Sequence, residues 1–136
     1  MTNDPTFEAV GGHATFVALV DAFYAGVAHD PVLRPMYPED ELDGAKWRLT
    51  AFLEQYWGGP TTYSDERGHP RLRMRHQAFP IDDVARDRWL THMVAALDSL
   101  DLAPMHHEAM LEYFDRAAHA MVNTIGEDER GSRPLL

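Results

Sequence analysis

Hydrophobic residues recur at helical intervals near the start of the chain. Between residues 16 and 27 they are one, three or four positions apart, so that they fall on one face of an amphipathic helix. These residues are Phe16, Leu19, Val20, Phe23, Tyr24 and Val27. A pair of glycines precedes the segment and Pro31 follows it, and both residue types interrupt helices. The pattern therefore predicts a long helix that ends close to His29.

Three further segments have the same periodicity. One spans about residues 42–57 and is stopped by two glycines and a proline. Another begins after Pro80, with Asp82 as its expected N-cap, and the last begins near Pro104, because proline is favoured in a first turn. Their apolar stripes are Leu49, Phe52, Leu53 and Tyr56; Trp89, Met93, Ala96, Leu97 and Leu100; and Met110, Phe114, Ala117, Ala118, Met121 and Ile125. No segment alternates apolar and polar residues as a half-buried strand would, so the expected fold class is all-α.

The length of the chain favours one compact domain. It has 136 residues, of which 45% are hydrophobic and 25% are charged, a composition that can fill a single core. We expect the folded domain to span residues 1–126. Residues 127–136 are rich in charge and contain glycine and proline, so we expect them to form a disordered tail.

Charge and composition narrow the classes of function. With 22 acidic and 12 basic residues, the formal net charge is -10, which disfavours nucleic acids as partners. No stretch is apolar enough to span a membrane, and the N-terminus lacks the features of a signal peptide, so the expected location is the cytoplasm. The absence of cysteine excludes disulfides, thiolate chemistry and iron–sulfur clusters. Eight histidines remain as candidate metal ligands.

A long segment at residues 61–80 separates the second and third predicted helices. It has no strong periodicity, and a loop of this length in a compact domain is usually functional or disordered. Within it, Leu72, His76 and Phe79 have the spacing of one side of a short helix, which would point the histidine inward. An isolated histidine is more often a core or surface residue, but imidazole is also a common axial ligand of haem iron.

Several short motifs, taken in their order and spacing, resemble the group II truncated haemoglobins. The most specific is QYWGGP at residues 55–60, followed by Tyr63 and by GHPRLRMRH at residues 68–76. Other matching stretches are residues 9–12, 23–24, 37–40, 86–90 and 118–123, and the resemblance covers about residues 7–125. It implies a two-over-two helical sandwich around haem b (iron protoporphyrin IX). It also implies a short first helix and a proximal iron ligand at His76.

The resemblance assigns a second group of residues to the side of the haem where a gas ligand binds. Tyr24, Tyr37 and Trp89 would surround the ligand and donate hydrogen bonds to the partial negative charge on bound oxygen. Each of the three has an ordinary alternative role as a packed core aromatic. Which tyrosine contacts the ligand directly stays open. Ala45 and Leu49 match the positions where other globins keep a distal histidine and an apolar neighbour, and neither side chain can donate.

The remaining assignments concern the haem ring and its carboxylates. Phe52, Leu53, Leu72 and Phe79 are expected apolar contacts of the ring, although each would serve equally in an ordinary core. The expected partners of the propionates are Arg48, Tyr63 and Arg75, since guanidinium and carboxylate groups pair well. Of the other histidines, His92 is expected at the edge of an apolar stripe. His119 is expected to pair with Asp115 at the surface.

The functional prediction is a haem protein that reversibly binds oxygen, nitric oxide and carbon monoxide. The family is also associated with nitric oxide oxidation and peroxidase-like turnover, and the sequence does not choose between binding and catalysis. Catalysis would require a separate reductase, because the chain has no flavin or nicotinamide motif. Two alternatives stay open: a cofactor-free helical interaction module, and a non-haem metalloprotein. A homo-oligomer is compatible with the sequence.

Overall fold

The computed structural model of the protein describes residues 5–37, 41–68 and 81–122. The described residues form α1 (Thr6–Ala9), α2 (Gly12–Val27), the short 3-10 helix η1 (Arg34–Met36), α3 (Asp43–Tyr56) and α4 (Thr62–Arg67). Two longer helices follow, α6 (Asp83–Asp98) and α7 (Pro104–Met121). All regular elements in these ranges are helical, which confirms the expected fold class.

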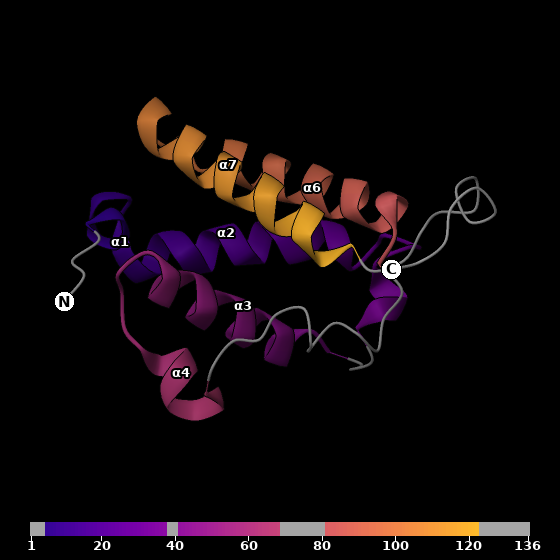
Figure 1. The fold of residues 1–136 in the computed structure, drawn as a ribbon, viewed down its shortest axis with the longest axis horizontal. Coiled ribbons are helices and arrows are strands. Elements are labelled where there is room, and N and C mark those ends of the chain that lie inside the picture. The colour runs from indigo at the N-terminus through magenta and orange to yellow at the C-terminus, as the bar shows by residue number, and fades with distance from the viewer. Residues whose placement is uncertain (1–4, 38–40, 69–80, 123–136) are drawn as a thin grey trace.

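The four long helices are arranged as two pairs (Figure 1). Helices α2 and α3 pack against each other on one side of the molecule, and α6 and α7 pack against each other on the other side. Helix α2 also contacts α6 and so joins the two pairs. This is the two-over-two arrangement that the resemblance implied.

The predicted face of α2 forms the centre of the core. All six of its apolar residues, from Phe16 to Val27, are buried. They meet Met93 and Leu97 of α6 and Met110 and Phe114 of α7, which are also buried. Full burial of a side chain of this size contributes roughly 1.5–3 kcal/mol, so this shared core is what holds the two pairs together.

The predicted helix starts on the C-terminal half are confirmed. Asp82 caps α6, and its carboxylate accepts a hydrogen bond of 2.9 Å from the backbone N–H of Ala85. Pro104 occupies the first turn of α7, where its missing N–H costs no helical hydrogen bond.

The predicted stripe of α3 needs a correction. Tyr56 was expected on the buried face, but it is 46% exposed, and its ring lies tilted against that of Tyr113 with centroids 4.2 Å apart. The residues of α3 that are buried are Ala45, Ala51, Leu53 and Glu54. Tyr56 lies at the last position of the helix, where a ring can leave the core and still keep an aromatic neighbour.

The periodicity showed neither of two short helices, α1 and α4. Helix α1 is the short first helix that the resemblance implied, whereas α4, at the start of the segment that was expected to lack periodicity, was not predicted. Elements of four to six residues are too short to show a repeat. Helix α4 is fixed from outside by the Gln55 side chain, which accepts from the backbone N–H of Ser64 at 3.0 Å and donates to its hydroxyl at 2.6 Å.

Some predictions fall outside the described residues. These are the short helix with Leu72, His76 and Phe79, the end of the last stripe at Ile125, and the tail. The division into a domain at residues 1–126 and a tail at residues 127–136 therefore stays a prediction. Among the described residues, no helix has the length and apolar character needed to cross a membrane.

Candidate functional site

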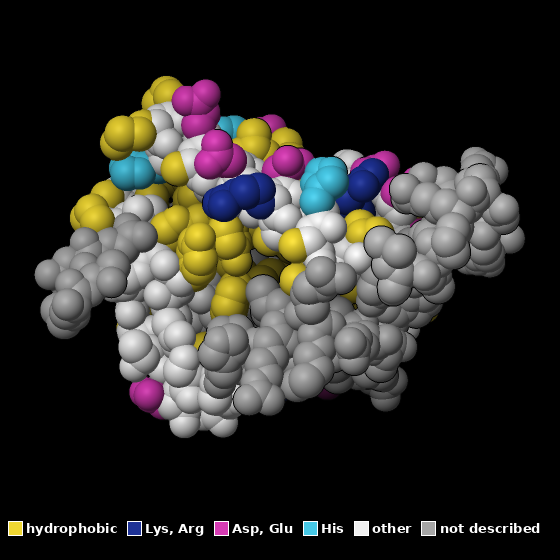
Figure 2. Space-filling model, viewed as in Figure 1, with side chains coloured by type: hydrophobic (Ala, Val, Ile, Leu, Met, Phe, Trp, Pro, Cys, Tyr) yellow, Lys and Arg dark blue, Asp and Glu magenta, His cyan; other side chains and the backbone are white. Residues whose placement is uncertain are grey.

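A cavity of about 450 Å³ lies between the two helix pairs. Its walls come from α3 on one side and from α6 and α7 on the other, and the turn around η1 closes one end. Figure 2 shows hydrophobic side chains gathered in a hollow on the face of the molecule that is also seen in Figure 1. Protein pockets that bind small molecules and cofactors have volumes of roughly 300–1,000 Å³ and mostly apolar walls. The cavity therefore has the size and character of a cofactor site.

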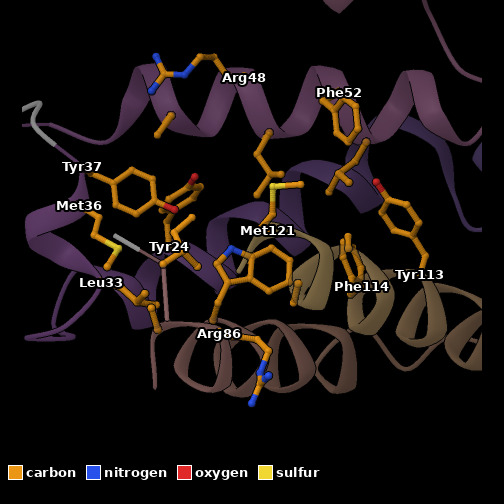
Figure 3. Close-up of a pocket in the computed structure, with 18 of the residues that line it drawn as sticks. Tyr24, Leu33, Met36, Tyr37, Arg48, Phe52, Arg86, Tyr113, Phe114 and Met121 are labelled. Atoms are coloured by element: carbon orange, nitrogen blue, oxygen red, sulfur yellow. The ribbon is translucent and has the colours of Figure 1, made fainter. Parts of the chain in front are cut away.

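One end of the cavity carries two phenol groups. In Figure 3, Tyr24 and Tyr37 lie together at this end, next to Leu33 and Met36. Their rings meet edge to face with centroids 5.5 Å apart, and the side chain of Tyr24 is only 4% exposed. Tyr24 belongs to the buried face of α2, and Tyr37 follows η1. The phenols thus supply polar groups within an otherwise apolar enclosure.

Trp89 of α6 lines the same cavity. Its ring is held by Phe23, at a centroid distance of 5.3 Å, and by Phe114, at 5.9 Å. Within residues 5–37, 41–68 and 81–122, no protein group accepts a hydrogen bond from its indole N–H. A half-buried donor in an apolar wall, with no acceptor among the described residues, is suited to an acceptor on a bound molecule.

The middle of the cavity has apolar walls. On α3 they are formed by Ala45, Leu49, Phe52 and Leu53, none of which can donate a hydrogen bond. Opposite them, α7 contributes Phe114, Ala117, Ala118 and Met121. Since these residues come from both helix pairs, the cavity exists only in the assembled fold.

Tyr113 of α7 is a further phenol that lines the cavity, and it lies at the opposite end from Tyr24 and Tyr37 (Figure 3). Burial, together with the neighbouring Tyr56, raises the pKa of Tyr113 to about 12, although Arg116 acts in the opposite direction. The group is therefore neutral at physiological pH, and it adds a hydroxyl but no charge to the wall.

Cationic side chains stand among the lining residues. Arg48 of α3, Arg67 of α4 and Arg86 of α6 all line the cavity. Arg67 lies over the ring of the buried Tyr63, 5.9 Å from its centroid, and in Figure 3 Arg86 points away from the interior. Arg86 pairs with Asp87 at 3.0 Å, so Arg48 and Arg67 are the lining arginines that can serve a carboxylate in this chain of net charge -10.

The structure brings most of the predicted site residues together. Those that line the cavity are Tyr24, Tyr37, Ala45, Arg48, Leu49, Phe52, Leu53, Tyr63 and Trp89. Leu72, Arg75, His76 and Phe79 lie outside the described residues, so their assignments stay predictions. The groups of three or more His, Cys, Asp or Glu side chains that a non-haem metal centre needs are absent from the described part of the chain.

Several lining residues were missed. Leu33, Met36, Ile81, Ala85, Arg67, Arg86 and Tyr113 line the cavity, and sequence reasoning assigned them no role. Phe114, Ala117, Ala118 and Met121 were recognised only as an apolar stripe. The available signal was the width of the apolar stripe on α7. Because α7 faces both a helix and the cavity, this stripe is wider than helix packing alone requires.

The residues present fit a haem group. The apolar middle suits a flat macrocycle, the arginines suit its two carboxylates, and the donor groups of Tyr24, Tyr37 and Trp89 suit a polar ligand at one end. An all-helical, two-over-two sandwich around such a cavity defines a globin-type haem protein.

Comparisons with known proteins agree with this class. The model of the bacterial-like globin family matches residues 5–123. Over 126 residues, the chain is 39% identical to a group 2 truncated haemoglobin of Bacillus subtilis (strain 168), covering 93% of this chain and 94% of that protein. The chain therefore belongs to the bacterial-like globin family, as a group II truncated haemoglobin.

Solved structures give the same result. The crystal structure of a thermostable haemoglobin from the actinobacterium Thermobifida fusca is similar, with a TM-score of 0.86, 59% identity, and coverage of 87% of this chain and 96% of that chain. The truncated oxygen-avid haemoglobin from Bacillus subtilis has a TM-score of 0.81 and 39% identity over 87% of this chain and 98% of that chain. Membership of this family implies a haem cofactor.

Proposed function

We propose that the protein binds haem b and uses it to bind oxygen and other diatomic gases reversibly. The observation that carries this proposal is the cavity, because it combines apolar walls with the donor groups of Tyr24, Tyr37 and Trp89. A cofactor-free helical module has no use for such a cavity, since helices that only pack together fill their interior with side chains. The similar haemoglobin from Bacillus subtilis that is described as oxygen-avid supports the same reading.

The chain's own residues would supply ligand stabilisation. Haem, when bound, supplies an iron atom that binds a diatomic gas, and bound oxygen then carries partial negative charge. Trp89 would donate from its indole N–H, and Tyr24 and Tyr37 from their hydroxyls. Each hydrogen bond to a charged acceptor is worth about 1.5–3 kcal/mol, and the apolar walls exclude the water that would compete for it.

The remaining roles are proposed from the sequence together with the cavity. His76 would bind the haem iron through one ring nitrogen, with its second ring nitrogen held by a nearby acceptor. Arg48, Tyr63 and Arg75 would hold the haem carboxylates, while Phe52, Leu53, Leu72 and Phe79 would contact the ring. Ala45 and Leu49 would not block the donor groups of Tyr24, Tyr37 and Trp89 from the gas ligand.

A haem titration tests this proposal. Addition of haem to the purified protein should give a strong Soret band that saturates at one haem per chain, and the reduced protein should bind oxygen and carbon monoxide reversibly. A protein without a Soret band at stoichiometric haem would be the cofactor-free module instead.

A second proposal is that the protein catalyses a reaction of the bound gas, and the number of hydrogen-bond donors in the cavity favours it. A ligand held by several hydrogen bonds dissociates slowly, which leaves time for a second reactant to arrive. Oxidation of nitric oxide would combine one nitric oxide, one oxygen and one electron to give nitrate, and a separate reductase would supply the electron. Nitrate formed per nitric oxide consumed, with a reducing system present, measures this activity, and peroxide-dependent oxidation of a phenol measures the peroxidase-like one. Unchanged nitrate and unoxidised phenol would leave the protein as a reversible binder.

A further inference from the structure

A buried carboxylate lies outside the cavity, next to two of its walls. Asp30 follows the end of α2, and only 5% of the residue is exposed. One of its oxygens accepts hydrogen bonds from the backbone N–H of Val32 at 2.8 Å and of Leu33 at 3.1 Å. The same oxygen accepts from the Arg88 guanidinium at 3.2 Å, and the other oxygen pairs with Nε2 of His92 at 2.7 Å.

These four contacts join two parts of the cavity wall. Leu33 belongs to the turn that closes the end with the phenol groups, and its backbone is held directly by Asp30. Arg88 and His92 belong to α6 and flank Trp89 in the sequence, one position before it and three after it. The carboxylate therefore fixes the segment of α6 that carries Trp89 relative to the turn.

The packing around this carboxylate is close. His92 lies against Gly26 of α2, where a Cβ atom would come within 2.3 Å of its Nδ1. Only glycine at this position lets the imidazole reach Asp30 in its present orientation. Burial by itself raises the pKa of Asp30, but the hydrogen bonds from His92, Leu33, Val32 and Arg88 outweigh it and hold the pKa well below its usual range. The group is thus a permanent anion at physiological pH.

We propose that Asp30, with His92 and Arg88, is a positioning unit for Trp89 that sets the direction of its indole N–H toward the gas ligand. This inference rests on the proposed function. The rings of Phe23 and Phe114 contact the indole, while the contacts of Asp30 hold the backbone segment of α6 that carries it, at Arg88 and at His92. A functional group generally has to be held within roughly 0.5 Å of its productive position, a displacement that one broken anchor on a helix can exceed.

The first test is a double-mutant cycle on oxygen dissociation. Asp30→Asn should raise the oxygen dissociation rate about three- to tenfold, less than the complete loss of the donor in Trp89→Phe. In the Trp89→Phe background, Asp30→Asn should have no further effect, because the donor on which it acts is gone. An equal increase in both backgrounds would overturn the proposal, as would a rate within a factor of two of the wild type.

A spectroscopic signature separates positioning from general loosening. The infrared stretch of bound carbon monoxide reports the field of nearby donors. In Asp30→Asn it should shift in the same direction as in Trp89→Phe, by a smaller amount. An unshifted band would contradict the proposed role, whatever the dissociation rate does.

Gly26→Ala provides a variant that should still fold. Alanine is a better helix former than glycine, yet its Cβ displaces His92 while Asp30 stays intact. It should speed oxygen dissociation without lowering the melting temperature by more than Asp30→Asn does. Wild-type oxygen affinity in this variant would overturn the proposal.

Asp98→Asn is the matched control. Asp98 lies at the end of the same helix and pairs with His107 at the same 2.7 Å, but this pair is exposed and does not line the cavity. Oxygen dissociation in Asp98→Asn should equal that of the wild type, and an increase like that of Asp30→Asn would mean that any weakening of α6 suffices. Failure of the proposed function would look different, because the wild-type protein itself would then show no Soret band.

Discussion

Replacing Trp89 with phenylalanine removes one indole N–H from the cavity and leaves an aromatic ring in its place. The wild-type ring is held edge to face by Phe23 and is also packed on Phe114, so a smaller ring at this position keeps both aromatic neighbours. The main change is therefore the loss of the donor, with a modest gain of free space beside it. We expect the variant to fold and to bind haem.

The size of the effect on the oxygen dissociation rate follows from the loss of one hydrogen bond to the ligand. A hydrogen bond to a charged acceptor is worth about 1.5–3 kcal/mol, and each 1.4 kcal/mol is a factor of ten, so the oxygen dissociation rate should rise by roughly one to two powers of ten. Tyr24 and Tyr37 still line the cavity, which bounds the loss to one donor. The rate of carbon monoxide association should change much less, because bound carbon monoxide carries less negative charge.

Stopped-flow displacement of oxygen measures the first rate, and flash photolysis measures the second. Trp57→Phe is the matched control, because Trp57 is a buried tryptophan that also packs on Phe114 but does not line the cavity. It loses the same atoms and should keep the wild-type oxygen rate. If Trp89→Phe stays within a factor of two of the wild type, or if Trp57→Phe matches it, the indole of Trp89 acts only in packing.

The other predictions concern the iron ligand, the entry of ligands and stability. His76→Gly should lose the wild-type Soret spectrum and regain a similar one with added imidazole; an unchanged iron–histidine Raman band would place the ligand elsewhere. Ala45→Trp should slow carbon monoxide association in flash photolysis, because Ala45 lines the cavity and a large ring there would narrow it; an unchanged rate would mean entry by another route. Asp30→Asn should lower the free energy of unfolding by about 3 kcal/mol at pH 7, as expected for one removed partner of a buried pair. Because the pKa of Asp30 is lowered in the folded state, its contribution is complete above about pH 5 and is lost as the pH falls below about 4. Urea unfolding of both proteins across this range measures the difference, and a constant difference down to pH 2 would refute the pKa argument.

The long helices could be predicted because their signals are local. The six large apolar residues between Phe16 and Val27 recur at the helical period, and all six are buried. Asp82 and Pro104 mark helix starts by their own backbone and side-chain chemistry, without help from distant residues. Helix α4 could not be found in this way, because it depends on the amide of Gln55 from the preceding helix.

The cavity could be predicted only in part. The resemblance to a family supplied Tyr37, Arg48 and Tyr63, whose own sequence surroundings are ordinary. Periodicity separates a buried face from an exposed one, but it does not distinguish a face buried by another helix from a face that borders a cavity. For this reason Tyr113 and Met121 appeared as stripe residues or not at all, although both line the cavity.

Asp30 marks the limit of sequence reasoning most clearly. Before Pro31 it has the appearance of a helix stop, and His92 has that of a residue at the edge of a stripe. Their role depends on the contact between the Asp30 carboxylate and the His92 ring, which lie 62 positions apart in the sequence. This contact is possible because Gly26 has no side chain in the space that the ring occupies. A buried charge costs stability unless donors surround it. An apolar contact between the same elements would hold them together without this desolvation cost. The carboxylate instead makes directional hydrogen bonds, because its two oxygens accept from the backbone of the turn and from side chains of α6. That directional restraint is what a wall carrying a hydrogen-bond donor requires.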